Sequence, residues 1–234
     1  MLSKLKTHLI ATLAMGVCMV AVGEAQAVPI LVSNFNFATP SLANGGINVG
    51  AVPGWTKSGG TAGNYNPDTT FYNNPQITDP PNSGVIGTMD DPRVGFLFQS
   101  QNQSLTNTTS YAVVPGEKYQ LTVAVGERNG SNASAFGGWK IELLDGDSVL
   151  AVNSGTTAPA ALSFGDVSLT YTAVALDAGF LRIRLSEPGT TYADYDNVRL
   201  DATPIAAVPE PASLALLSVG LASLVSLRMR RRKR

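Results

Sequence analysis

Paired carboxylates are the residues of this sequence best suited to chemistry. Three pairs lie close together in the chain: Asp90 and Asp91, Asp145 and Asp147, and Asp194 and Asp196. A sugar hydrolase needs two carboxyl groups that face each other across its substrate. Asp91 precedes a proline and Asp145 precedes a glycine, so turn formation explains the first two pairs. A secreted, carboxylate-dependent hydrolase is therefore a further alternative rather than the main prediction.

Histidine and cysteine are missing from residues 28–207, because the single His8 and the single Cys18 precede them. This composition excludes disulfides, His-ligated or Cys-ligated zinc, cysteine nucleophiles and serine–histidine catalysis from the stretch. The same residues include eight basic and fifteen acidic side chains, a net charge of −7, which argues against nucleic acid as a partner. We therefore expect a non-catalytic binding or structural protein.

The last predicted strand contains a carboxylate that needs a partner. Strict alternation puts Asp194, Asp196, Val198 and Leu200 on one face. If Val198 lies in the core, Asp196 is buried, and a buried carboxylate requires a metal ion, an ion pair or hydrogen-bond donors. Two alternatives follow: a structural calcium ion held by oxygen ligands, or backbone N–H groups of the opening strand. No other cofactor is expected.

Aromatic side chains provide the predicted ligand contacts. Tyr65, Phe71 and Tyr72 lie among Asn, Pro and Thr residues without strand alternation. Flat rings on exposed loops suit the apolar faces of sugars, and the alternative is that these rings cover one end of the fold. Trp55 follows Pro53-Gly54 and is predicted either to pack in the core or to stack on a sugar.

Alternation of apolar and polar residues predicts β-strands in the second half of residues 28–207. Alternating runs begin at Tyr119, Trp139, Val167 and Leu181, and turns rich in Gly, Asn and Asp separate them. Strands with one buried face are typical of antiparallel sheets. We predict an all-β fold, an antiparallel β-sandwich of the jelly-roll type. Its predicted core includes Leu121, Val123, Ile141, Leu169, Ile183 and Val198.

The first half of the same stretch is less regular. Residues 30–37 and 93–100 are predicted as strands, and the segment from Pro40 to Pro92 holds seven of the fourteen prolines. A loop of about 50 residues is unusual inside a compact domain. Short strands are therefore expected near Trp55 and over residues 85–88.

Residues 1–27 have the three parts of a secretory signal peptide. Lys4 and Lys6 form the basic start, an apolar run follows over residues 9–22, and Ala25 and Ala27 form a small-residue cleavage site. Cleavage after Ala27 leaves residues 28–207 as an exported body. The alternative is an uncleaved membrane anchor.

Residues 208–234 have three parts in a fixed order: Pro209-Glu210-Pro211, an apolar run from Ala212 to Leu227, and a basic tail. The run predicts a short transmembrane helix, about 24 Å long at 1.5 Å per residue. Because basic residues stay cytoplasmic, the body lies on the opposite side of the membrane. The tail comprises Arg228, Arg230, Arg231, Arg232, Lys233 and Arg234.

This ordered triplet closely resembles the PEP-CTERM sorting signal of Gram-negative bacteria that make exopolysaccharide, also catalogued as an ice-binding-protein C-terminal domain. The resemblance implies an exosortase-type membrane enzyme as a partner and anchoring in the inner membrane during sorting. A final place at the cell surface or in the extracellular matrix is then expected. The resemblance is confined to residues 208–234 and implies nothing about the ligand of the body.

Short phrases of the body resemble galactose-binding-like jelly rolls, many of which are carbohydrate-binding modules. Such modules commonly open with Asn-Gly-x-Phe-Glu, whose Glu helps to hold calcium, whereas this chain has Phe35 and Ala38 in place of Gly and Glu. The resemblance implies an exported protein that binds polysaccharide without catalysis. The alternative is a structural or adhesive matrix protein without a defined ligand. The phrases are Asn34-Phe35-Asn36-Phe37, Val52-Pro53-Gly54-Trp55, Val114-Pro115-Gly116-Glu117-Lys118-Tyr119 and Asp196-Asn197-Val198-Arg199-Leu200.

Overall fold

A computed structural model describes residues 25–66, 93–98, 103–126, 136–158, 164–174, 177, 179–189 and 191–204. All of its strands belong to one compact unit, Gln26–Ile205. The predicted signal peptide, apart from its last three residues, and the predicted transmembrane helix lie outside the described residues, as does the strand expected over 85–88. None of the described residues forms a helix long and apolar enough to cross a membrane.

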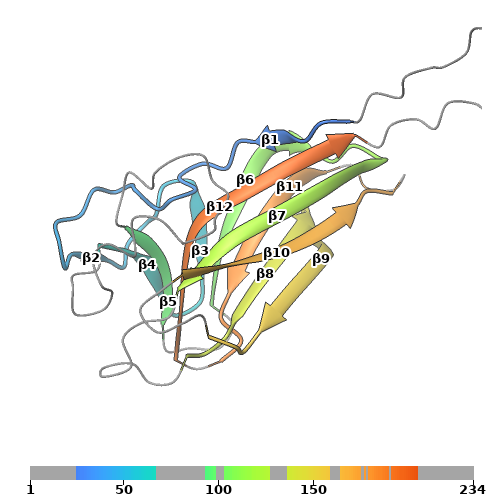
Figure 1. Ribbon diagram of the computed structural model, residues 1–234. Helices are drawn as coiled ribbons and strands as arrows, with labels where there is room; N and C mark the ends of the chain where they lie inside the picture. Colours follow the sequence, from blue (N-terminus) through green and yellow to red (C-terminus); the bar gives the residue numbers. More distant parts are fainter. Residues whose placement is uncertain are drawn as a thin grey trace, which may run out of the picture. The chain divides into compact units, whose positions relative to one another are not determined.

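One layer of the unit is a sheet that we call sheet A (Figure 1). Its strands run in the order β10-β7-β12-β5-β4-β2, and β1 pairs with the second half of β12. The strands are β1 (Val28–Ile30), β2 (Ile47–Asn48), β4 (Thr61–Tyr65), β5 (Val94–Phe98), β7 (Glu117–Gly126), β10 (Phe164–Thr172) and β12 (Tyr192–Pro204).

The second layer, sheet B, has the order β3-β6-β11-β8-β9. Every pairing in the two sheets is antiparallel, so the predicted all-β sandwich is confirmed. The strands of sheet B are β3 (Trp55–Ser58), β6 (Ser104–Ala112), β8 (Trp139–Asp145), β9 (Ser148–Gly155) and β11 (Phe180–Ser186).

The core between the sheets contains all six side chains that the sequence predicted there, each at most 7% exposed. Tyr195 of β12 joins the two layers through this core. Its hydroxyl donates a hydrogen bond to Ser186 O (2.6 Å) and accepts one from Lys140 N (3.2 Å), both in sheet B. A buried hydroxyl is favourable only with such partners, and these two fix β12 against β8 and β11.

The opening strand is shorter than predicted, because β1 ends at Ile30 and a turn follows. Asn34 and Phe37 in that turn have left-handed φ values of 50° and 53°, which cannot continue a strand. The Asn34 side chain stabilises the turn, since its Nδ2 donates to Thr39 O and its Oδ1 accepts from Thr39 N. Asparagine favours such local bonds and tolerates the left-handed conformation.

A bulge in β12 changes which side chains face the core. The register between β12 and β7 shifts between Asp196 and Arg199, and Asn197 has a left-handed φ of 46°. Before the shift, Ala193 and Tyr195 lie in the core, whereas Val198 and Leu200 do so after it. The expectation that Asp196 shares a face with Val198 is therefore wrong, because one extra residue reverses the alternation.

Candidate functional site

Two buried carboxyl groups lie on the outer face of sheet A, directed away from the core. Asp194 is paired directly with Phe96 of β5 and Gly126 of β7, and Asp196 with Ala124 of β7. Both carboxyl groups are fully buried. The bulge places them on this face instead of in the core between the sheets.

Aromatic side chains surround Asp194. The Tyr65 hydroxyl donates a 2.9 Å hydrogen bond to Asp194 Oδ2, although the two residues are 129 positions apart in the chain. The ring of Tyr65 meets that of Phe96 edge to face, with centroids 5.6 Å apart. We call the group formed by Tyr65, Phe96, Phe164, Asp194 and Asp196 the sheet A site; Val94, Phe98 and Ala124 complete its apolar cluster.

Asp196 is held in an environment that favours its protonated form. Burial raises the pKa of Asp196 well above its ordinary value of 3.8, and the hydrogen bond from Asn197 N to Oδ1 (2.7 Å) offsets this only in part. Its Oδ2 has no hydrogen-bond partner among the described residues. A protonated carboxyl group is a hydrogen-bond donor and a general acid, so Asp196 is suited to giving a proton to a bound molecule.

The calcium predicted at Asp196 has little support from neighbouring ligands. Within the described ranges, no group of three or more His, Cys, Asp or Glu side chains is placed to hold a metal ion. Calcium takes six to eight oxygen ligands, several of them carboxylates. Calcium binding by Asp196 therefore stays a prediction.

Of the four aromatic residues predicted to contact a ligand, the structure describes Trp55 and Tyr65, which lie in different parts of the fold. Trp55 is 6% exposed and stacks on Phe37 with ring centroids 5.0 Å apart, while its Nε1 donates to Asn34 O. This position favours the alternative of core packing. Tyr65 is buried in the sheet A site, so its ring is not an exposed platform. Phe71 and Tyr72 lie outside the described residues, as does the Asp90-Asp91 pair.

The remaining predicted residues belong to the two terminal segments and to the turn between β8 and β9. Ala25 and Ala27 precede β1, and Ala27 is exposed. Pro209, Glu210, Pro211 and the basic tail lie outside the described residues. Asp147, in the turn between β8 and β9, forms an ion pair with Arg182, which agrees with a structural role for that turn.

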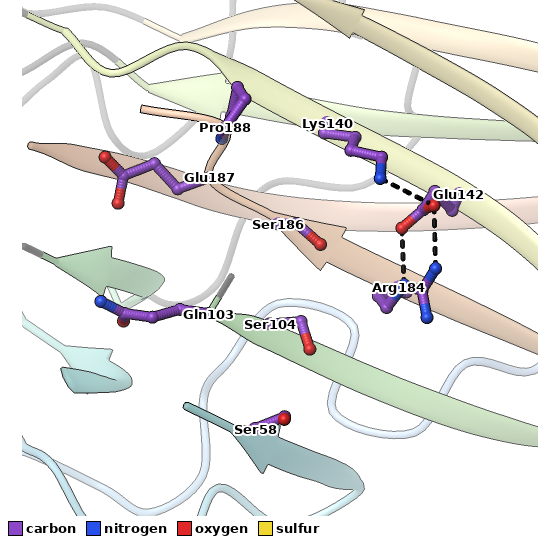
Figure 2. A pocket seen from close by; sticks show the side chains of 9 residues that line it. All are labelled: Ser58, Gln103, Ser104, Lys140, Glu142, Arg184, Ser186, Glu187 and Pro188. Atoms are coloured by element: carbon purple, nitrogen blue, oxygen red, sulfur yellow. Dashed lines mark hydrogen bonds and ion pairs between the residues drawn. The ribbon is translucent and has the colours of Figure 1, made fainter. Parts of the chain in front are cut away.

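A polar groove of 490 Å³ lies on the outer face of sheet B (Figure 2). We call it the sheet B groove. Neighbouring strands provide its serine hydroxyls, and Figure 2 shows Ser58, Ser104 and Ser186 on three of these strands. Its lining residues are Ser58, Gln103, Ser104, Lys140, Glu142, Arg184, Ser186, Glu187 and Pro188.

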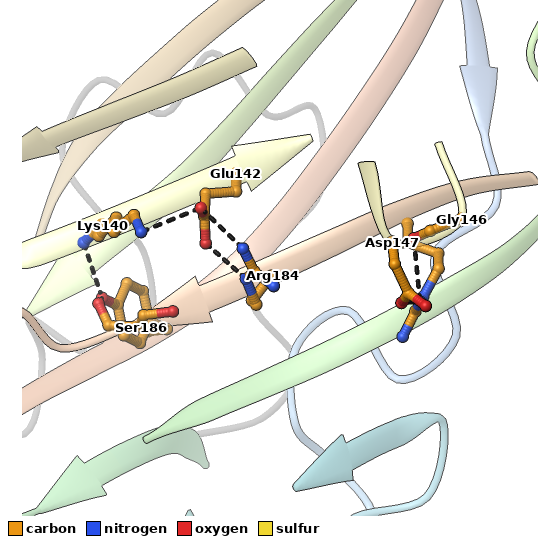
Figure 3. Close-up of polar contacts among 8 residues, drawn as sticks. Lys140, Glu142, Gly146, Asp147, Arg184 and Ser186 are labelled. Carbon is orange, nitrogen blue, oxygen red and sulfur yellow. Dashed lines mark hydrogen bonds and ion pairs between the residues drawn. The ribbon is translucent and has the colours of Figure 1, made fainter. Parts of the chain in front are cut away.

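Two basic and two acidic side chains line the groove, Lys140 and Arg184 against Glu142 and Glu187, so their formal charges cancel. Glu142, with a side chain 3% exposed, lies between Lys140 (3.0 Å) and Arg184 (2.9 Å to Nη2), as Figure 3 shows. Burial alone would raise the pKa of Glu142, but the hydrogen bonds from Arg184 and Lys140 outweigh it and lower that pKa. The hydrogen bond to Glu142 likewise raises the pKa of Arg184. Glu142 and Arg184 are therefore both charged at neutral pH.

The sequence alone did not identify Asp194, Phe96 and Phe164 as parts of one site. Their convergence depends on the pairing of β12 with β5 and of β10 with β7, which no local pattern specifies. One signal was available: Ala193 and Tyr195 are apolar at odd positions, whereas Val198 and Leu200 are apolar at even ones. That change of phase at Asn197 is typical of a bulge.

Two family descriptions match the chain. The HpiC1-like family, described as HpiC1 cyclase, matches residues 28–201. The PEP-CTERM protein-sorting motif matches residues 207–232, which confirms the resemblance drawn from Pro209, Glu210, Pro211 and the basic tail. None of the curated proteins matches the chain.

Solved structures of cyclases are similar to the body. The apo form of a cyclase from Fischerella sp. is 28% identical, with a TM-score of 0.63 over 77% of this chain and 98% of that chain. A cyclase from Fischerella sp. TAU, in complex with 4-(1H-indol-3-yl)butan-2-one, is 26% identical, with a TM-score of 0.61 over 77% of this chain and 100% of that chain. Because almost the whole of each solved chain is matched, we expect residues 28–207 to fold without the terminal segments.

One carbohydrate-binding module also matches, at a lower TM-score. The module TmCBM61, solved in complex with β-1,4-galactotriose, is 12% identical, with a TM-score of 0.42 over 73% of this chain and 97% of that chain.

Proposed function

Because the chain belongs to the family of HpiC1-like cyclases over residues 28–201, we propose that its body binds a small ring compound at the sheet A site. The observation that carries this proposal is the buried Asp194 carboxyl group, held by the Tyr65 hydroxyl at 2.9 Å inside an aromatic cluster. The similar cyclase solved with 4-(1H-indol-3-yl)butan-2-one supports a ligand with an aromatic ring.

The chemistry of the site suits such a ligand. Flat apolar rings pack edge to face or in offset stacks against aromatic side chains such as Phe96 and Phe164. An indole N–H is a donor, and the Asp194 carboxyl group accepts hydrogen bonds. The site is shielded from water, and a hydrogen bond in such surroundings is electrostatically stronger than the same bond in solvent.

Acid-assisted rearrangement or cyclisation of the bound compound is part of the proposal, in place of the non-catalytic role expected from the sequence. The raised pKa of Asp196 supports it, because a protonated carboxyl group near the ligand can give a proton to an alkene or a ring carbon. The resulting carboxylate takes a proton back when the rearranged product forms. Such a reaction needs no oxidant, reductant or co-reactant.

Replacing Asp194 with asparagine is expected to weaken binding of 4-(1H-indol-3-yl)butan-2-one to residues 28–207. The asparagine amide has one acceptor oxygen where the carboxyl group has two. Loss of one hydrogen bond costs about 0.5–1.5 kcal/mol, which corresponds to a reduction in affinity of about 2- to 13-fold. Tyr65→Phe is expected to have a smaller effect in the same direction. Titration calorimetry measures both, with the exposed Ser110→Ala on sheet B as the control. Equal affinities for the wild type and Asp194→Asn would rule out this site.

The PEP-CTERM motif marks the protein for export, C-terminal membrane anchoring and exosortase processing. Its final location at the cell surface or in the extracellular matrix is part of our proposal. Mass spectrometry of the extracellular fraction is expected to find peptides of the body without the basic tail at residues 228–234. Intact tail peptides in that fraction would contradict processing near Pro209.

Binding of an extracellular polysaccharide is the second candidate function. The sheet B groove favours it, because its serine hydroxyls and its equal numbers of basic and acidic side chains suit polar, uncharged ligands. A structural or adhesive role without a ligand predicts that the groove binds nothing.

A further inference from the structure

A continuous row of polar side chains crosses all five strands of sheet B. Each member is the direct cross-strand partner of the next, so all of them point to the same face. Neighbours such as Leu105 and Leu185 point into the core, which places the row on the outer face. In strand order β3-β6-β11-β8-β9, the row is Ser58, Ser104, Ser186, Lys140 and Ser154.

A second row, two residues along each strand, runs beside the first. It places Thr56, Thr106, Arg184 and Glu142 in consecutive strands. The Arg184 guanidinium and the Lys140 ammonium both contact the Glu142 carboxylate. Glu142 therefore pairs with two cations at once, while the hydroxyl groups border the groove.

This pattern selects the chemical class of the ligand. An anion would have to compete with Glu142 for Lys140 and Arg184. A cation would meet two carboxylates that already have partners, because Glu142 pairs with these two cations and Glu187 accepts a hydrogen bond from Thr191 N. Serine and threonine hydroxyls both donate and accept hydrogen bonds, which matches the hydroxyl groups of a sugar. The row spans four inter-strand spacings of about 4.8 Å, or about 19 Å in total, enough for a ligand longer than a single sugar ring.

We propose that the sheet B groove binds an uncharged polysaccharide whose chain lies along this row, across the strands. This inference rests on the second candidate function and gives it a site. The groove and the sheet A site are on opposite outer faces of the sandwich, so each can be altered separately. Tyr195 bonds the backbone at Lys140 and Ser186, which holds the middle of the row in place.

The test is affinity electrophoresis of residues 28–207 in gels that contain xylan, galactan or a neutral glucan, with alginate as the charged comparison. The wild type is expected to be retarded by at least one neutral polysaccharide. Ser104→Ala/Ser186→Ala is expected to bind it about tenfold more weakly, since two hydrogen bonds are lost. Ser58→Leu, at an exposed edge position, provides a second variant that leaves the core untouched.

Ser168→Ala is the matched control, because it removes an exposed hydroxyl from the opposite sheet. Retention of binding in this control and loss in the groove variants supports the proposal. If a neutral polysaccharide binds all variants equally, this site is wrong while polysaccharide binding elsewhere stands. If alginate alone retards the wild type, the uncharged class is wrong. If no polysaccharide retards it, both the site and the second candidate function fail.

Discussion

Replacing Tyr195 with alanine is expected to lower the free energy of unfolding of residues 28–207 by about 3–5 kcal/mol, the range for removing a large buried aromatic side chain. The side chain is fully buried in the core. Its loss leaves a cavity and also leaves Ser186 O and Lys140 N without their bonds to the hydroxyl. Urea unfolding followed by circular dichroism measures the change.

Tyr195→Phe separates the contribution of packing from that of the two hydrogen bonds. It keeps the packing and removes only the hydroxyl, so it is expected to cost about 1–3 kcal/mol, the range for leaving buried polar groups without partners. The exposed Val152→Ala provides a baseline close to zero. A loss below 1 kcal/mol for Tyr195→Ala would show that this residue does not hold the two sheets together.

Replacing Asp196 with asparagine is expected to increase stability at neutral pH. Burial raises the pKa of Asp196 in the folded protein above its ordinary value of 3.8, so the folded state binds a proton that the unfolded state releases. This difference in proton binding lowers the free energy of unfolding of the wild type. The loss is absent below about pH 3.8 and grows as the pH rises toward the raised pKa. At pH 7 the gain is expected to be about 1–3 kcal/mol, the scale for a buried polar group without a partner.

The measurement is the difference in free energy of unfolding between Asp196→Asn and the wild type from pH 3 to pH 8. This difference isolates Asp196 from groups such as Glu142, whose lowered pKa has the opposite effect on stability. The difference should be near zero at pH 3 and should rise with pH. A variant that is less stable than the wild type at every pH would contradict this, and sensitivity of the wild type to EDTA would then favour the predicted calcium ion.

Stabilisation by Asp196→Asn would also support a functional reason for the buried acid. A residue that lowers the stability of the free protein can be retained in evolution because catalysis requires it. Such trade-offs between stability and activity are common at active sites. The same substitution should abolish any acid-assisted turnover of a bound ring compound, because an amide cannot give the proton.

Local pattern predicted much of the fold. The alternation around Leu121, Ile141 and Ile183 identified the buried faces of three strands, and the turn at Asp145-Gly146 separates β8 from β9 as expected. These features depend on neighbours within a few residues. The early end of β1 was missed because it depends on the left-handed Asn34 and Phe37, which strand propensity does not report.

The candidate sites depend on contacts between distant parts of the chain. Tyr65 was singled out as a ligand contact, but its bond to Asp194 requires β4, β5 and β12 to lie side by side. The row of polar side chains on sheet B likewise requires the observed register in four strand pairs at once. A shift of one residue in any pair would turn its side chains to the other face, so the sequence alone could not show these sites.

The crystal structure of residues 28–207 with 4-(1H-indol-3-yl)butan-2-one tests the proposed function most directly. We expect the indole ring against Phe96 and Phe164, with its N–H within hydrogen-bonding distance of the Asp194 carboxyl group. Crystals of Asp194→Asn should show a lower occupancy of the ligand at the same subsaturating concentration. A ring bound elsewhere, such as in the sheet B groove, or a wild-type site without the ligand at saturating concentration, would contradict the assignment of this site.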